Sequence, residues 1–474
     1  MNFFTCARVA TVRQQGALPA QSAAASNCGM ASHAKSSWRR FLRAEDRRSS
    51  DWVRFWAGVG IAATAAYTAK VLINLFGPAL PYSMAECPGG SNDSPEFLEF
   101  LSTVTNASIR NASLQLLTNG PEFYPAELAA IRGAAHCIDM EFYTWQPGKV
   151  SDEFLAALVD RARAGVQVRI LVDAIGSYGT PRRMFQPLLD AGGEMFWYHP
   201  IRWNTWQFAN NRSHRKAIIV DGRIGFAGGA GIADRWIHAT AQGPRWRDSM
   251  FRIEGEAVRG LVSIFAENWL EASGAILSDP RQFSAPLQTG DCQALVVEST
   301  PAGGGTTARI LFQALLTSAR KSIDITTPYF LPSHSARAAL IAAARERGVK
   351  VRIIVAGPHI DHPMVRRVSR HSSRHLLRAG AEIFEYQPSM IHAKLMVVDD
   401  AWCVFGSTNF DHRSFALNDE LNVATRNPQL ARQMLRDFEQ DLGNSKKLTL
   451  EMLTPGGPLG ALELAGGALL ERES

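Results

Sequence analysis

Two stretches of the chain, SHRKAIIVDGRIGFAGGAGI at residues 213–232 and IHAKLMVVDDAWCVFGSTNF at residues 391–410, follow one plan. The residues that they share are His214, Lys216 and Asp221 in the first stretch and His392, Lys394 and Asp399 in the second. The hydrophobic run after each lysine predicts a strand, and side chains two positions apart on a strand point to the same face. We therefore expect each histidine and lysine to face a substrate, whereas the aspartates mainly hold the geometry of a turn.

The sequence around each stretch repeats in the same order. The first copy reads LQLLTNG, ELAAIRGAAHCIDMEFYTW, FLAALVDRARAGVQVRILVDA and LLDAGGEMFWYHP, and the second reads ALVVEST, RILFQALLTSARKSIDITTPYFL, ALIAAARERGVKVRIIVAG and LLRAGAEIFEYQP. Short β-branched runs alternate with stretches of helical periodicity. We therefore predict two α/β sandwich halves at residues 112–290 and 291–445, each with a largely parallel sheet, related by a pseudo-twofold axis and sharing one active site.

Two histidines and two lysines suit chemistry at a phosphodiester. One imidazole can attack phosphorus and form a phosphohistidine, which divides a difficult displacement into two easier ones. The second imidazole can protonate the leaving alkoxide and then deprotonate the incoming alcohol or water. The lysines stabilise the charge that builds on the non-bridging oxygens. The scheme requires no metal and no cofactor, and we predict none.

Four more side chains are candidates for this site. Asp248 and Glu420, one downstream of each motif, carry carboxylates that could orient the histidines through their second ring nitrogen. Tyr143 and Tyr329 occupy equivalent positions at predicted strand ends, so both could line a pocket. The alternatives are surface carboxylates and core aromatic residues.

The Gly-rich turns differ between the copies. The second turn carries Ser407 and Asn409, which we predict to bind or orient the substrate. The first turn has Gly229 and Gly231 at these positions and lacks both side chains. We expect backbone amides of the first turn to substitute for the missing donors.

Taken together, residues 112–442 resemble the phospholipase D superfamily with two such motifs, most closely its bacterial-type cardiolipin synthase branch. The resemblance rests on the paired motifs and on LLTNGPEFYPAELAAI, TPYFLP, HAKLMVVD and FGSTNFDHRSFALNDE. It implies a phosphatidyltransferase that joins two phosphatidylglycerols into cardiolipin, releases glycerol and passes through a phosphatidyl-histidine without metal. It also implies that His214 is the nucleophile and His392 the acid and base.

Other functions fit the same residues. A phospholipase D would pass the phosphatidyl group to water, a nuclease would cleave nucleic acid, and a lipid-binding module would do no chemistry. The aromatic insert Trp203–Phe208 and the Arg-rich stretch 366–374 favour phosphatidylglycerol and other anionic phospholipids at a membrane. We expect no nucleic-acid partner, and the sequence leaves the oligomeric state open.

The composition, with 46% hydrophobic and 20% charged residues, excludes a wholly disordered chain. The six cysteines are scattered without a CxxC pair, so neither a zinc site nor a disulfide framework is predicted. The net charge of +6 suits an anionic partner, although much of the excess lies in the first fifty residues.

The termini fall outside the repeat. We interpret residues 1–50 as a basic low-complexity or targeting segment, residues 51–77 as a membrane-spanning helix, residues 78–111 as a linker and residues 446–474 as a tail. The arginines before the span and the acids after it place the amino terminus inside and the catalytic body across the membrane. We expect the bacterial cytoplasmic membrane, with the mitochondrial inner membrane as the alternative.

Overall fold

The computed structural model describes residues 51–69, 83–84, 86–201, 210–241, 243–283, 290–300 and 306–453. The chain divides into two units, residues 1–77 and 78–474. In the first unit, residues 51–69 form a solvent-exposed helix. No helix in the described ranges is both long and apolar enough to cross a membrane. The predicted span at 51–77 is therefore not found there, and its last residues, 70–77, lie outside the described ranges together with residues 1–50.

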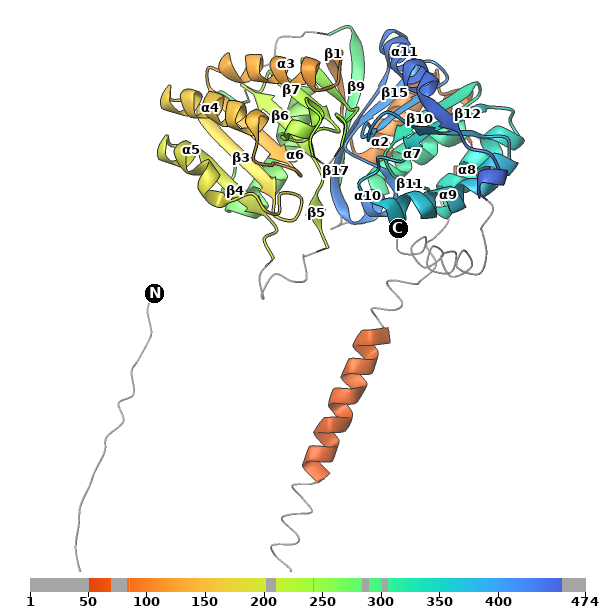
Figure 1. Cartoon of the computed structure of the whole chain (residues 1–474), viewed down its shortest axis with the longest axis horizontal. Coiled ribbons are helices and arrows are strands. Elements are labelled where there is room, and N and C mark those ends of the chain that lie inside the picture. Colours follow the sequence, from red (N-terminus) through yellow and green to blue (C-terminus); the bar gives the residue numbers. More distant parts are fainter. Residues whose placement is uncertain are drawn as a thin grey trace, which may run out of the picture. The chain divides into compact units, whose positions relative to one another are not determined.

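The first half of the second unit (Figure 1) alternates strands and helices as the repeat predicts. Its strands are β1 (Ile109–Thr118), β2 (Cys137–Phe142), β3 (Gln167–Asp173), β4 (Glu194–Tyr198), β5 (Arg212–Ser213), β6 (Lys216–Val220), β7 (Ile224–Gly228) and β8 (Ser249–Glu254). Its main helices are α3 (Gly120–Arg132), α4 (Lys149–Arg163), α5 (Gln186–Asp190) and α6 (Val258–Ser273).

Helix α2 (Pro95–Thr105) precedes the first half in the sequence but packs against α7 of the second half. Its strands are β9 (Cys292–Ser299), β10 (Ser322–Thr327), β11 (Phe330–Leu331), β12 (Lys350–Ala356), β13 (Glu382–Tyr386), β14 (Leu395–Val398), β15 (Trp402–Gly406), β16 (Phe410–Asp411), β17 (Asn418–Arg426) and β18 (Ser445–Lys447). Its helices are α7 (Thr306–Ser318), α8 (His334–Arg345), α9 (Pro363–Arg378), α10 (His412–Ala416) and α11 (Pro428–Gly443).

Equivalent strands occupy equivalent places in the two halves. The order is β1-β8-β7-β6-β2-β3-β4 in the first half and β9-β17-β15-β14-β10-β12-β13 in the second, with β18 added at the far edge. The halves meet where β1 pairs antiparallel with β9, Ile109 opposite Leu295. In Figure 1, β9 and β17 accordingly lie at the centre of the unit. This matching order is what a pseudo-twofold repeat predicts.

The expectation of a largely parallel sheet is wrong for half of each sheet. Among the longer strands that the structure describes, β2-β3-β4 and β10-β12-β13 pair parallel, whereas β6 with β7 and β14 with β15, the strands that begin at or after the motif lysines, pair antiparallel. The reason lies in the turns. β6 and β7 are joined by residues 221–223 only, with positive φ at Asp221 (53°) and Gly222 (62°), and so short a connection permits only an antiparallel pair.

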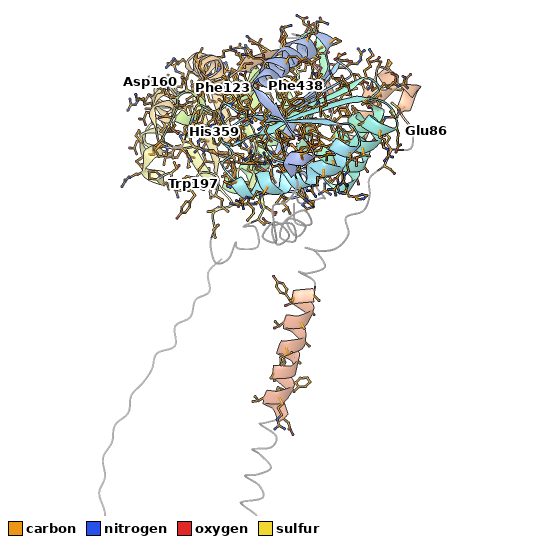
Figure 2. The ribbon with its side chains drawn as sticks, turned by 45° about the vertical axis from the view of Figure 1, so that its right-hand side comes forward. Glu86, Phe123, Asp160, Trp197, His359 and Phe438 are labelled. Carbon is orange, nitrogen blue, oxygen red and sulfur yellow. The ribbon has the colours of Figure 1, made fainter. Side chains whose placement is uncertain are left out.

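Both halves contribute to one shared core. Helices α6 and α11 bury Phe265 and Met434 in it, and the rings of Phe251 on β8 and Phe405 on β15 stack with centroids 3.6 Å apart. Away from this core, Phe123 of α3 is fully buried, whereas Asp160 of α4 faces solvent (Figure 2). The shared core fixes the halves against each other, which a site built from both of them requires.

Candidate active site

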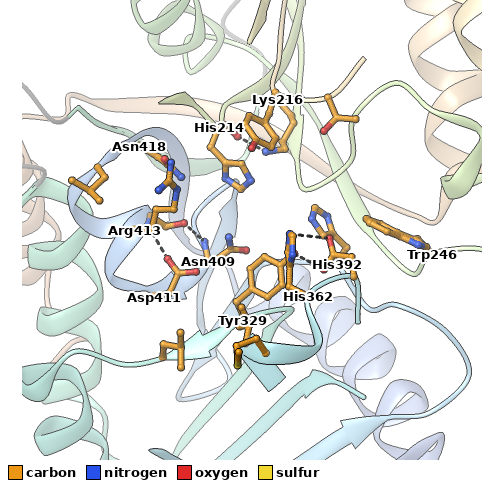
Figure 3. Close-up of a pocket in the computed structure, with 18 of the residues that line it drawn as sticks. His214, Lys216, Trp246, Tyr329, His362, His392, Asn409, Asp411, Arg413 and Asn418 are labelled. Atoms are coloured by element: carbon orange, nitrogen blue, oxygen red, sulfur yellow. Dashed lines mark hydrogen bonds and ion pairs between the residues drawn. The ribbon is translucent and has the colours of Figure 1, made fainter. Parts of the chain in front are cut away.

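A pocket of about 550 Å³ opens where the two motifs meet (Figure 3). His214, Lys216 and Tyr143 line it from the first half, and His392, Tyr329 and Asn409 line it from the second. The structure thus brings the two predicted histidines and both predicted tyrosines to one cavity. Lys394 lies directly behind His392, buried and with its Nζ 3.2 Å from Nε2 of that ring.

His214 is held by the opposite half of the molecule. Its Nδ1 lies 3.0 Å from Oε1 of Glu420, and its backbone N–H donates to the carbonyl of Asp419 at 2.9 Å. The short strand β5, directly before His214, pairs parallel with the start of β17. Because a carboxylate can only accept, Nδ1 carries the hydrogen and leaves Nε2 for the substrate.

His392 is held in the same way by the first half. Its Nδ1 lies 2.9 Å from Oδ2 of Asp248, and its backbone N–H donates to the carbonyl of Arg247 at 2.7 Å. The two predicted acids therefore do meet the histidines, but each acid orients the histidine of the other motif.

The carboxylates are anchored by different donors. The Ser407 hydroxyl donates to Oε2 of Glu420, whereas the Trp236 indole N–H donates to Oδ2 of Asp248 at 2.9 Å. The expectation that amides of the first Gly turn replace the missing side chains is wrong for this contact. The amide of Gly229 instead donates to the carbonyl of Ser249, at 3.2 Å.

The electrostatics of the pocket follow from its burial. Burial, together with the neighbouring lysines, lowers the pKa of both histidines to about 4, although Glu420 and Asp248 oppose the shift. Burial likewise lowers the pKa of Lys394 to about 8 and that of Lys216 well below its usual value. Burial would raise the pKa of Glu420, but His214 and Lys216 outweigh it and bring the pKa to about 2. At neutral pH the site therefore holds ionised acids and neutral imidazoles.

The motif aspartates lie outside the pocket. Asp221 accepts hydrogen bonds from the backbone N–H groups of Ala135, His136 and Cys137 at 2.7–2.9 Å. Asp399 does the same for residues 320–322 and also accepts from the side chain of Asn92 at 2.8 Å. Both aspartates thus fix a turn to the neighbouring loop through hydrogen bonds and do not line the pocket. This placement agrees with the geometric role expected of them.

Aromatic rings pack against the histidines. The Tyr143 ring meets His214 edge-on at 5.0 Å between centroids, and Lys216 Nζ lies 5.3 Å from the Tyr143 ring centroid. On the other side of the pocket, Trp246 and Trp236 lie 5.2 and 5.8 Å from His392. The Tyr329 hydroxyl donates to Oδ1 of Asp361 at 2.6 Å.

Sequence reasoning missed several residues that line the pocket. They are Arg235, Trp236, Trp246, Asp361, His362, Asp411, Arg413 and Asn418. The sequence could have indicated Arg235 and Arg413, because the two arginines follow their Gly turns at the same distance in both copies. His362 gave no such signal, because it follows a strand that carries no motif.

Two expectations about lipid contacts fare differently. Arg366 and Arg370 of the Arg-rich stretch both bind the carboxylate of Glu385, so internal ion pairs already engage them. The aromatic insert, residues 203–208, lies outside the described residues.

Within the described ranges, no group of three or more His, Cys, Asp or Glu side chains is arranged to hold a metal ion.

A family model described as "Cardiolipin synthase, PLD-like domain" matches residues 128–243 and 312–442, which include both motifs. The chain belongs to this family. A cardiolipin synthase 1 of Bacillus anthracis is 36% identical over 344 residues, covering 70% of this chain and 67% of that protein. A cardiolipin synthase of a Geobacillus species is 34% identical over 377 residues, covering 78% and 74%. The resemblance noted in the sequence is thereby confirmed.

Among solved structures, a phosphatidylserine synthase of Haemophilus influenzae matches with a TM-score of 0.60. The match covers 79% of this chain and 99% of that one at 16% identity, and it concerns the fold alone. The matched region reaches well beyond either half of the repeat, so the likeness extends to a fold that contains both halves.

Proposed function

We propose that this protein is a phosphatidyltransferase that joins two phosphatidylglycerols into cardiolipin and releases glycerol. The observation that carries the proposal is the single pocket onto which His214 and His392 open, each held by a carboxylate of the opposite half. Membership of the cardiolipin synthase family supports the choice of reaction. Phosphatidylglycerol is the simplest donor and acceptor, since two molecules of it contain every atom of the two products.

The reaction would run in two displacements. In the first, Nε2 of His214 attacks phosphorus, the bond from phosphorus to the glycerol oxygen breaks, and His392 gives the leaving glycerol its proton. In the second, His392 takes the proton from a hydroxyl of another phosphatidylglycerol, whose oxygen attacks phosphorus and breaks the bond to Nε2. Glycerol leaves after the first step and cardiolipin after the second.

The charges of the pocket suit this sequence. A neutral His214 is ready to attack, because burial keeps its pKa near 4. The phosphodiester brings a negative charge beside His392 and favours its protonated form, so the acid becomes active with substrate bound. Lys216 and Lys394, both buried, stabilise the oxygens that gain charge in the transition state.

Attachment to the bacterial cytoplasmic membrane is part of the proposal. It rests on the bacterial relatives and on residues 51–69, whose exposed side chains include Trp52, Phe55 and Trp56. Removing residues 1–82 should reduce co-flotation with vesicles of phosphatidylglycerol while thermal unfolding of the body stays cooperative. Undiminished flotation of the truncated protein would place the attachment in the body.

The main test is to incubate the full-length protein with phosphatidylglycerol vesicles and to separate the lipid and water-soluble products. Cardiolipin and free glycerol should form in equal amounts, and added glycerol should drive the reaction backwards. His214→Ala serves as the inactive control. If phosphatidic acid were the main product and no cardiolipin formed, the protein would be a phospholipase D that uses water.

A further inference from the structure

The repeat makes it possible to compare the two sides of the pocket position by position. Trp246 and Asn418 each stand two residues before an orienting acid, and both line the pocket. Trp236 and Ser414 each stand seven residues after Gly229 and Ser407, and both line it as well. At each pair of equivalent positions the first half supplies an indole and the second half a polar side chain.

The side built by the first half is aromatic. The rings of Trp236 and Trp246 lie 5.3 Å apart, and the guanidinium of Arg235 lies 4.8 Å from the Trp246 ring. The second half contributes a polar cluster, the polar side, formed by Asn409, Asp411, Ser414 and Asn418, next to apolar lining residues that include Leu331, Val365 and Val368. Figure 3 shows the labelled members of the polar side on the opposite side of His214 from Trp246.

The polar side has acceptors in excess. Asn409 and Asn418 are only 5% and 6% exposed, and the side-chain oxygen of each is buried without a hydrogen-bond partner. Asp411, also buried, uses Oδ1 to accept from the backbone N–H of Ser414 at 2.8 Å. A buried acceptor without a donor is costly, and such groups commonly mark a place where a ligand donates.

We propose that Asn418, Asn409 and Asp411 form a polyol subsite, which binds the glycerol hydroxyls of the headgroup that leaves and of the headgroup that enters. Hydroxyl groups supply the donors that these acceptors lack, and both asparagines line the cavity. The aromatic side then faces the less polar, diacylglyceryl part of the lipid. This inference rests on the proposed function and deepens it, because it states which side of the pocket selects the alcohol.

The test compares phosphatidylglycerol with phosphatidylpropanol of the same acyl chains, whose headgroup lacks two hydroxyls. Each lipid is labelled in its head alcohol and added as a minor donor to the same excess of unlabelled phosphatidylglycerol, so that both donors have the same acceptor. The measured quantity is the rate of head-alcohol release, counted whether the phosphatidyl group passes to a lipid or to water. If the protein were a hydrolase, the proposed function would be wrong, but the measurement would still test the subsite. The wild type should prefer phosphatidylglycerol by about tenfold or more, the usual effect of leaving buried acceptors unpaired.

Asn418→Leu, which has nearly the same size, should reduce this preference about tenfold. Trp246→Leu is the matched control from the equivalent position, and it should lower both rates without changing their ratio. Asp411→Asn keeps a helix-capping side chain at position 411, so it tests the subsite in a second fold-compatible variant and should reduce the preference by a smaller factor. Equal rates for the two lipids in the wild type, an unchanged ratio in both polar variants, or an equal change of ratio in Trp246→Leu would each overturn the proposal.

Discussion

His214 donates its Nδ1 hydrogen to Glu420 at 3.0 Å, although the two residues belong to different halves of the chain and stand 206 positions apart. His392 and Asp248 repeat this relationship in the other direction at 2.9 Å. Neither half therefore contains a histidine together with the acid that orients it. The site depends on how the halves pack, and a change in one half should disable the histidine of the other.

Replacing the orienting acids tests this crossed arrangement. Glu420→Gln and Asp248→Asn should each lower kcat by about 10²–10⁴, because a misoriented imidazole loses most of its acid–base or nucleophilic power. The expected signature is a fall in kcat with little change in KM, measured as cardiolipin formation at increasing phosphatidylglycerol. Asp160→Asn, which removes an exposed acid of α4 outside the pocket, is a suitable control. Near-normal kcat in both acid variants would contradict the role of the crossed pairs.

The pKa values of the two histidines should lie below the ordinary imidazole value. In the free protein, imidazole NMR signals of His214 and His392 should titrate near pH 4, because burial and the neighbouring lysines favour the neutral form. Inorganic phosphate in the pocket should raise the pKa of both rings. Glu420→Gln should lower the pKa of His214 further, since the charge of Glu420 is what opposes the shift. A titration near the ordinary imidazole value would show that water reaches both rings.

A covalent label should distinguish the role of His214 from the role of His392. With phosphatidylglycerol labelled at phosphorus, rapid acid-free quenching of the wild type should trap an acid-labile phosphoprotein. His214→Ala should lose the label completely, whereas His392→Ala should still form it at a rate about 10²–10⁴-fold lower. The reverse pattern would assign the nucleophile to His392.

Activity should survive chelators. The proposed steps use Lys216 and Lys394 to stabilise the charge on the phosphate oxygens, so they need no divalent ion. Cardiolipin formation should be equal before and after dialysis against EDTA at fixed ionic strength. Loss of activity that one divalent ion restores would contradict this scheme.

The motif aspartates should affect folding more than chemistry. Asp221→Ala removes three charged hydrogen bonds to backbone N–H groups and should lower the free energy of unfolding by about 2–4 kcal/mol. Asp221→Asn keeps the oxygen that accepts two of them and should cost about 1 kcal/mol. Chemical denaturation measures both values. The specific activity of the folded fraction should change little, because Asp221 does not line the pocket.

The sequence predicts the repeat, the alternation of strands and helices and the convergence of the motifs, because these depend on patterns within each half. It did not predict that Glu420 serves His214, because that contact depends on the pairing of β5 with β17 across the halves. It also overestimated the parallel part of each sheet, since helices next to strands suggest crossovers whereas the turns at residues 221–223 and 399–401 form hairpins. The difference between Trp246 and Asn418 is visible in the sequence, but only the pocket shows that it matters.

The glycine at position 229 makes the two copies of the repeat non-interchangeable. A Cβ atom there would come within 2.3 Å of Oδ1 of Asp248, whereas the serine at the equivalent position 407 donates to the longer Glu420. Serine would clash in the first turn while Asp248 stays in place, and glycine in the second turn would remove the Ser407 hydroxyl that donates to Glu420. Exchanging these two residues one at a time between the copies should therefore impair the site, so neither half can serve as a template for the other.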